Sequence, residues 1–415
     1  MLGGDLLLDD YKFSVGNNRE LFNIDPKPTT WTLAISTIFA MMSRCDSLQL
    51  DIHFHYGVIN MTITAVLGLI LNLVASALFI RTWRFNFGNN YADIVHDAFG
   101  HGSIIIRIVF IVSLVYSSIL LMHHTKTTIH SIVIPRLGDG TILTSHPFIY
   151  YALCTAFSLP ALFPKRFVDM NLYFILANIA EILVLATTIY FFAKDMKETG
   201  FNPQEKIQWF VKDFWETIHG FATWIVIFWI GPFICAISKY LKDTKQSTIM
   251  NVVYSSSFLA FIVNFAIPLL GHFHFYGSCD EEMITGFYDE KSAMTTVGQV
   301  GVLINALVTN AGYIFLASNE LTQLFHKNDI LFIKLWSYIT IVLLNCLLLT
   351  YFEGRNELYF EIFGNISYLF FSLILPPILY LKAFKFREIW GFVSVFFLIF
   401  AIALSCCIIY VHVIE

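Results

Sequence analysis

The sequence contains little charge: only 13% of its 415 residues are Asp, Glu, Lys or Arg, whereas 57% are apolar. Soluble globular chains carry about 25% charged residues, so this composition excludes an ordinary soluble domain and indicates a polytopic membrane protein. The net charge is −5, so basic residues are not in excess over acidic ones. This argues against nucleic acid as a partner.

Motifs of enzyme and metal chemistry are also missing. The predicted loops contain no nucleotide-binding glycine loop, no metal-ligand cluster and no nucleophile motif. The seven cysteines form no C-x-x-C pair, so we expect them to pack in apolar segments, without a metal site or a disulfide framework. The first 29 residues do not resemble a cleavable signal peptide. We therefore expect a protein that is not an enzyme and that holds no metal or organic cofactor.

Long apolar runs dominate what is present. Eleven stretches are long enough to cross a hydrocarbon core of about 30 Å as helices. Because lipid cannot satisfy the open edge of a sheet, the predicted fold class is all-α, with the lipid bilayer as its surroundings. The stretches lie near residues 30–51, 57–82, 102–134, 145–163, 171–193, 217–240, 248–271, 294–318, 329–352, 360–384 and 390–413.

The positions of Lys and Arg predict the orientation. More of them fall in the loops that share a side with the N-terminal segment than in the opposite loops, which places the N-terminus in the cytosol. Residues 1–29 are then a cytosolic tail and residues 30–413 the transmembrane domain. The sequence leaves open a plasma membrane or a lysosome- or vacuole-like membrane, and it does not predict the oligomeric state.

Some ionisable residues lie inside the predicted spans. Glu181 lies in the middle of the fifth span, where an ionised side chain costs roughly 3 kcal/mol or more, so it needs a buried partner or a proton. Arg44 and Asp46 end the first span and form either an ion pair at a helix end or part of a site. For Arg107 two interpretations are open: a side chain that reaches the membrane interface, or one that faces a pathway.

Two spans contain signals that interrupt a helix. The stretch 43–47, "SRCDS", ends the apolar run of the first span, and Gly231-Pro232 lies in the middle of the sixth. A proline removes a backbone donor, so the second signal predicts either a simple kink or a true break. Breaks in the first and sixth of eleven spans are typical of transporters built from two inverted repeats of five helices.

Four stretches carry a family resemblance. The stretch "GNISYLFFSLILPPILYLK", 364–382, contains Gly364, Pro376, Tyr380 and Lys382 at the spacing of a tenth-helix signature. The others are "YADIVHDAFG" at 91–100, "GHFHFYGSCDEEM" at 271–283 and "VTNAGYIF" at 308–315. In order and spacing they resemble the amino acid/auxin permease family, and are most similar to its sodium-coupled neutral amino acid transporters.

The resemblance implies a leucine-transporter-like fold: a five-plus-five inverted repeat followed by an eleventh helix. Repeat one would cover about 30–193, repeat two about 217–384, and the extra helix about 390–413. It also implies secondary active transport of amino acids, coupled to sodium ions or protons, with the substrate between the broken first and sixth helices.

The implied site includes both interruptions. Arg44 would pair with a substrate carboxylate, and Asp46 with an α-amino group or a cationic side chain. Ion coupling is assigned to Thr309, which matches the sodium-site threonine of the family, and to Asp46 and Glu181 as proton carriers. The predicted substrate-binding residues are Ser43, Arg44, Cys45, Asp46, Ser47, Trp229, Ile230, Gly231 and Pro232.

The chain departs from the family pattern at this site. The stretch 43–45 stands where the family has Gly-Ser-Gly, and Leu50 replaces a proline. Phe39 occupies the position of an asparagine that helps to hold sodium, and a phenyl ring cannot ligate a hard cation. In the sixth helix Pro232 matches, but 230–231 replaces Cys-His. These changes leave open sodium or proton coupling, and also a second function: an amino acid sensor that binds without transporting.

Overall fold

We analysed a computed structural model of the chain. The residues that it describes fall into thirteen segments: 29–43, 57–86, 91–138, 148–164, 166–198, 200, 207, 209–210, 214–275, 292–325, 331–352, 364–386 and 389–414.

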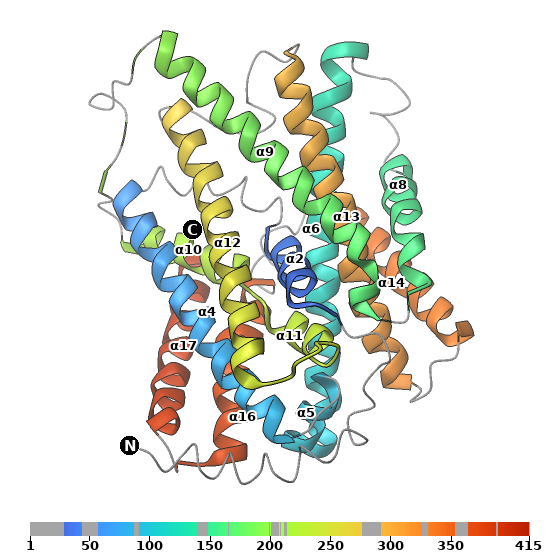
Figure 1. The fold of residues 1–415 in the computed structure, drawn as a ribbon, viewed down its shortest axis with the longest axis vertical. Helices are drawn as coiled ribbons and strands as arrows, with labels where there is room; N and C mark the ends of the chain where they lie inside the picture. Colours follow the sequence, from blue (N-terminus) through green and yellow to red (C-terminus); the bar gives the residue numbers. More distant parts are fainter. Residues whose placement is uncertain are drawn as a thin grey trace.

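Helices make up nearly all of the described segments, and the predicted all-α fold class is confirmed (Figure 1). An isolated bridge between Thr29 and Leu241 is the exception. Within the described segments, seven spans are long and apolar enough to cross a membrane. Their main helices are α4 (Val58–Asn86), α6 (Ser103–Leu137), α9 (Asn171–Glu198), α12 (Gln246–Phe275), α13 (Ala293–Phe325), α16 (Leu375–Phe384) and α17 (Ile389–Ile414).

The other predicted spans correspond to shorter or interrupted helices. The first is α2 (Trp31–Met42), which ends directly before the interruption predicted at 43–47, and the rest of this span, 44–51, lies outside the described residues. The fourth is α8 (Phe148–Ser158), which passes into a 3₁₀ turn where Pro160 removes a backbone donor. The ninth is α14 (Leu331–Phe352).

The sixth span is broken, so of the kink and the true break that Gly231-Pro232 left open, the structure has the break. Helix α10 (Phe214–Ile227) ends three residues before α11 (Gly231–Ser238) begins. The interruption lies at 228–230, just before Gly231-Pro232, because proline is well tolerated in the first turn of a helix but not in its interior.

Helix α13 forms the centre of the molecule. It packs along α6 and α9 over most of its length (Figure 1). Polar residues such as Asn305, Thr309 and Asn310 are as fully buried as the apolar ones. A helix that is buried all round must satisfy such side chains internally, because lipid offers them no partner. By contrast, α17 leaves Phe392, Phe396 and other apolar side chains exposed at the edge.

The tenth span contains a short π-helical segment, Phe370–Ile374, directly before the prolines of α16. Prolines 376 and 377 cannot donate to the preceding turn, which accounts for the local widening of the helix. π-segments frequently mark functional sites, and this one lies beside the sixth-span break, because a ring contact joins Phe371 to Trp229.

Candidate functional site

The open end of α2 is held by side chains of other helices. The last carbonyl groups of a helix lack partners within the helix. Asn264 of α12 donates to the Met42 carbonyl at 3.0 Å, and Tyr313 of α13 donates to the Met41 carbonyl at 3.5 Å. The Ser43 carbonyl accepts from Asn305 of α13 at 3.0 Å. The end of α2 is therefore stabilised by three hydrogen-bond donors from two other helices.

Asn305 joins three helices at one point. Besides Ser43, its Nδ2 donates to the Ala177 carbonyl at 3.4 Å and to Glu181 Oε2 at 3.1 Å, both on α9. Its Oδ1 accepts from the Thr309 hydroxyl at 3.5 Å. We call Ser43, Glu181, Asn305 and Thr309 the α2–α9–α13 network. All four are at most 2% exposed.

Three predicted site residues therefore meet in this network. Ser43, Glu181 and Thr309 are far apart in the sequence, and the structure links all of them through Asn305. Two polar atoms of this network, Ser43 Oγ and Glu181 Oε1, have no partner among the described residues. Buried polar atoms without partners are uncommon and call for a functional explanation.

The sixth-span break provides the second part of the site. The N–H of Trp229 donates to the Val226 carbonyl at 3.1 Å, and that of Phe233 to the Ile230 carbonyl at 2.9 Å. These tighter bonds replace the regular α-helical pattern. Ile230 is the N-cap of α11, and Gly231 and Pro232 are its first two residues. The break at 228–230 therefore lies directly before the predicted Gly231-Pro232.

Trp229 places a free donor beside this break. Its ring packs edge-on against Tyr368, with centroids 4.6 Å apart, and the hydroxyl of Tyr368 is hydrogen-bonded to Ser117 of α6. The indole Nε1 of Trp229 is buried and has no partner among the described residues. In the π-segment, the hydroxyl of Ser372 is likewise buried and unpaired. Donors of this kind are suited to a polar ligand.

Tyr313 connects the two parts. Its hydroxyl contacts the end of α2, and its ring packs edge-on against Phe233 of α11, with centroids 5.8 Å apart. Phe233 in turn stacks on Phe167 at 6.0 Å. The two interrupted helices thus approach the same face of α13 through aromatic side chains.

A cavity of about 970 Å³ opens on the side of α11 that leads away from the break. It is lined by α5 (Tyr91–Phe99), α6, α11 and α13. Tyr91, Phe110 and Phe315 line its apolar wall. Tyr91 and Phe110 stack with centroids 4.4 Å apart, and Phe110 contacts Trp229. Aromatic rings therefore separate this cavity from the break.

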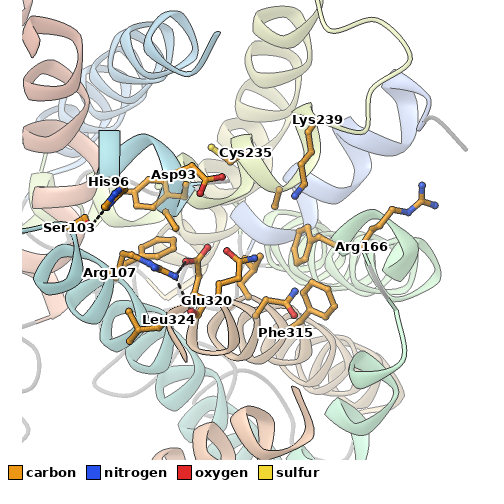
Figure 2. A pocket seen from close by; sticks show the side chains of 18 of the residues that line it. Asp93, His96, Ser103, Arg107, Arg166, Cys235, Lys239, Phe315, Glu320 and Leu324 are labelled. Carbon is orange, nitrogen blue, oxygen red and sulfur yellow. Dashed lines mark hydrogen bonds and ion pairs between the residues drawn. The ribbon is translucent and has the colours of Figure 1, made fainter. Parts of the chain in front are cut away.

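The polar wall of the cavity carries both signs of charge (Figure 2). Arg107 of α6 and Glu320 of α13 form an ion pair of 3.9 Å, and the guanidinium also donates to the Glu320 carbonyl at 3.4 Å. Asp93 of α5 and Lys239 at the end of α11 face the same space. Arg107 therefore lines this cavity and pairs with Glu320, and its place in a pathway stays a prediction.

The remaining predicted substrate residues, Arg44, Cys45, Asp46 and Ser47, lie outside the described residues. Their role stays a prediction. Asn305 is the main residue that the sequence reasoning missed. A signal existed, because Asn305 and Thr309 are polar side chains one helical turn apart inside a predicted span.

The fold is similar to that of solved membrane transporters. A substrate-bound, outward-open Na⁺-coupled sialic acid symporter matches with a TM-score of 0.59 and 12% identity, over 94% of this chain and 89% of that chain. A manganese transporter from Eremococcus coleocola, in complex with an aromatic bis-isothiourea compound, matches with a TM-score of 0.57 and 10% identity, over 91% and 85%. No family model and no curated protein sequence matches the chain.

The chain is thus an integral, multi-pass membrane protein with the leucine-transporter fold. Identities near 10% show the fold alone. Membership of the amino acid/auxin permease family, the limits of the two repeats and the side of the N-terminus stay predictions.

Proposed function

We propose that the chain is a secondary active transporter of amino acids that couples their movement to an ion. The observation that carries this proposal is the pair of interrupted helices: α2 ends early with its carbonyl groups capped by other helices, and the sixth span breaks before Gly231. Interrupted helices of this kind form substrate and ion sites near the middle of the membrane in transporters.

The cavity provides a path from that centre to one side. Residue 29, at the start of the described chain, pairs with Leu241 just beyond α11, so the cavity opens on the side that the Lys and Arg distribution assigns to the cytosol. The aromatic rings above it close the path to the break. This arrangement fits an alternating-access cycle in which the broken helices move against α6 and α13.

The charges of the cavity suit a zwitterion. Arg107 and Lys239 present cations, and Asp93 and Glu320 present carboxylates, around one space. An amino acid carries both an ammonium and a carboxylate group, and each has an opposite charge to meet along this path.

Uptake of a mixture of labelled L-amino acids into proteoliposomes tests the proposal. We expect accumulation that depends on an imposed ion gradient and that falls strongly in Arg44→Ala and Asp46→Asn. Binding of amino acids without any uptake would favour the sensor instead. Wild-type protein that is folded but neither binds nor accumulates an amino acid contradicts both functions.

The Arg107–Glu320 pair yields a second prediction. Arg107→Gln leaves a largely buried carboxylate without its cation, and such a loss costs about 3–5 kcal/mol for a fully buried pair. We expect a clear fall in uptake and in thermal stability. The exchanged variant Arg107→Glu with Glu320→Arg should recover part of both.

Lys245→Gln is the matched control for this prediction. Lys245 pairs with Asp243 at 3.7 Å, but their side chains are 76% and 46% exposed. Such surface pairs contribute about 0–1 kcal/mol. Equal losses from Arg107→Gln and Lys245→Gln would show that the cavity pair has no special role.

A further inference from the structure

The α2–α9–α13 network points to the coupling ion. We propose that this ion is a proton and that Glu181 carries it. Asn305, which bonds to both Glu181 and the Ser43 carbonyl, couples the protonation of Glu181 to the open end of α2. This inference rests on the proposed function, because a coupling ion has meaning only if the chain transports.

An amide group already occupies the position that a metal cation would need. The Ser43 carbonyl, the Ala177 carbonyl and Glu181 Oε2 surround the Nδ2 of Asn305 at 3.0, 3.4 and 3.1 Å. Hard cations take such oxygen atoms as ligands. Here all three accept from the same N–H₂ group, and the Thr309 hydroxyl donates to the other end of the amide. The oxygen atoms that a sodium ion would take are therefore already bonded to protein donors.

Glu181 has room for a proton. It is 2% exposed, and its Oε1 is buried without a partner among the described residues, while Oε2 accepts one hydrogen bond. The amide of Asn305 carries no charge and cannot balance a carboxylate. A buried carboxylate in this setting is costly, and a proton on Oε1 removes its charge without displacing Asn305.

No other ionisable side chain in the described structure bonds to Glu181. Helix α2 has none, and the neighbouring helices have few. Those on α12 and α13 with described side chains are Tyr254, His272, Tyr313 and Glu320, and the 3₁₀ turn before α9 has Asp169, paired with Arg166. On α9 itself they are Tyr173, Tyr190, Lys194, Asp195, Lys197 and Glu198. Among the residues that the structure describes, the proton is thus assigned to Glu181.

Asn305 connects the proton to the helix end. A hydrogen bond to an ionised carboxylate is roughly twice as strong as one to a neutral acceptor. When Glu181 takes up a proton, the hydrogen bond from Asn305 Nδ2 to Glu181 weakens. The hydrogen bond from Nδ2 to the Ser43 carbonyl at the end of α2 then strengthens. One proton enters as the carboxylate becomes a carboxyl group, and the same proton leaves on the other side of the membrane.

The test compares Glu181→Gln with Glu198→Gln, the same change at an exposed position of the same helix. Proteoliposomes with each variant and with wild type receive a mixture of labelled L-amino acids under a proton gradient without sodium, a sodium gradient without a proton gradient, or no gradient. A pH-sensitive dye inside the vesicles records proton entry during uptake. Exchange of labelled for unlabelled amino acid at equal pH is measured in parallel.

We expect wild type and Glu198→Gln to accumulate amino acids under the proton gradient, with proton entry. Glu181→Gln should lose this accumulation and the dye signal but retain exchange, which shows that the variant is folded. Accumulation driven by sodium alone, or a Glu181→Gln variant that still accumulates with protons, overturns the inference and leaves the proposed function intact. Wild type that neither accumulates nor exchanges amino acids overturns the proposed function.

Discussion

Replacement of Asn305 by leucine is expected to abolish uptake and to lower the free energy of unfolding more than any other single change in the network. The leucine removes all four hydrogen bonds of the amide, three of them to other helices, and leaves the Ser43 carbonyl and the Glu181 carboxyl group without the donor that Asn305 provides. Hydrogen bonds between membrane helices average about 0.6 kcal/mol each, so the bonds alone account for about 2 kcal/mol. Orphaned buried acceptors add about 1–3 kcal/mol each.

Asn264→Leu is the matched control, because Asn264 makes one hydrogen bond of the same kind, to the Met42 carbonyl at 3.0 Å. It is buried to the same degree as Asn305. Unfolding by titration with SDS in mixed micelles compares the two variants. We expect a several-fold larger loss in the free energy of unfolding for Asn305→Leu than for Asn264→Leu. Equal losses would mean that the network only caps the end of α2.

Replacement of Gly301 by leucine is expected to prevent correct packing of α9 on α13. A Cβ at this position would lie 2.9 Å from the Ala180 carbonyl oxygen and 3.0 Å from Val184 Cγ2. Because a backbone oxygen cannot move aside as a flexible side chain can, the two helices must separate. Overpacking of this kind costs about 1–3 kcal/mol or more, and it displaces Glu181, which directly follows Ala180.

Gly102→Leu introduces the same side chain where there is space. Gly102 is exposed, its φ is −64°, and the nearest atom to its added Cβ is Phe99 Cβ at 4.0 Å. Yield of folded protein by size-exclusion chromatography and the midpoint of thermal unfolding in detergent distinguish the variants. A Gly301→Leu protein as stable as Gly102→Leu would contradict the close approach of α9 and α13.

The fold was largely predictable because the length and the apolar composition of a stretch are enough to indicate a membrane-spanning helix. All eleven apolar stretches correspond to helices or helix pairs, and the break in the sixth follows from Gly231-Pro232. The end of the first helix at Met42 lies directly before the interruption predicted at 43–47. The sequence did not reveal that Asn264 and Asn305, from two distant helices, would bind the carbonyl groups at this end.

The candidate site was predictable only in part. A lone carboxyl group inside a span requires a partner, which identified Glu181 from the sequence. Which residue meets it depends on how α9 crosses α13, and sequence spacing along one helix does not contain that information. The same holds for the cavity, because Lys239 and Glu320 come from helices far apart in the chain and meet only after the helices pack.

Exchange across a membrane reports whether the chain transports amino acids at all. Proteoliposomes loaded with an unlabelled mixture of L-amino acids are diluted into a labelled mixture without any ion gradient. We predict that the label inside the vesicles rises transiently above its equilibrium level. Vesicles without the protein should show no such overshoot. Binding of amino acids to the folded protein without an overshoot would contradict the account and would make the chain a sensor with a transporter fold.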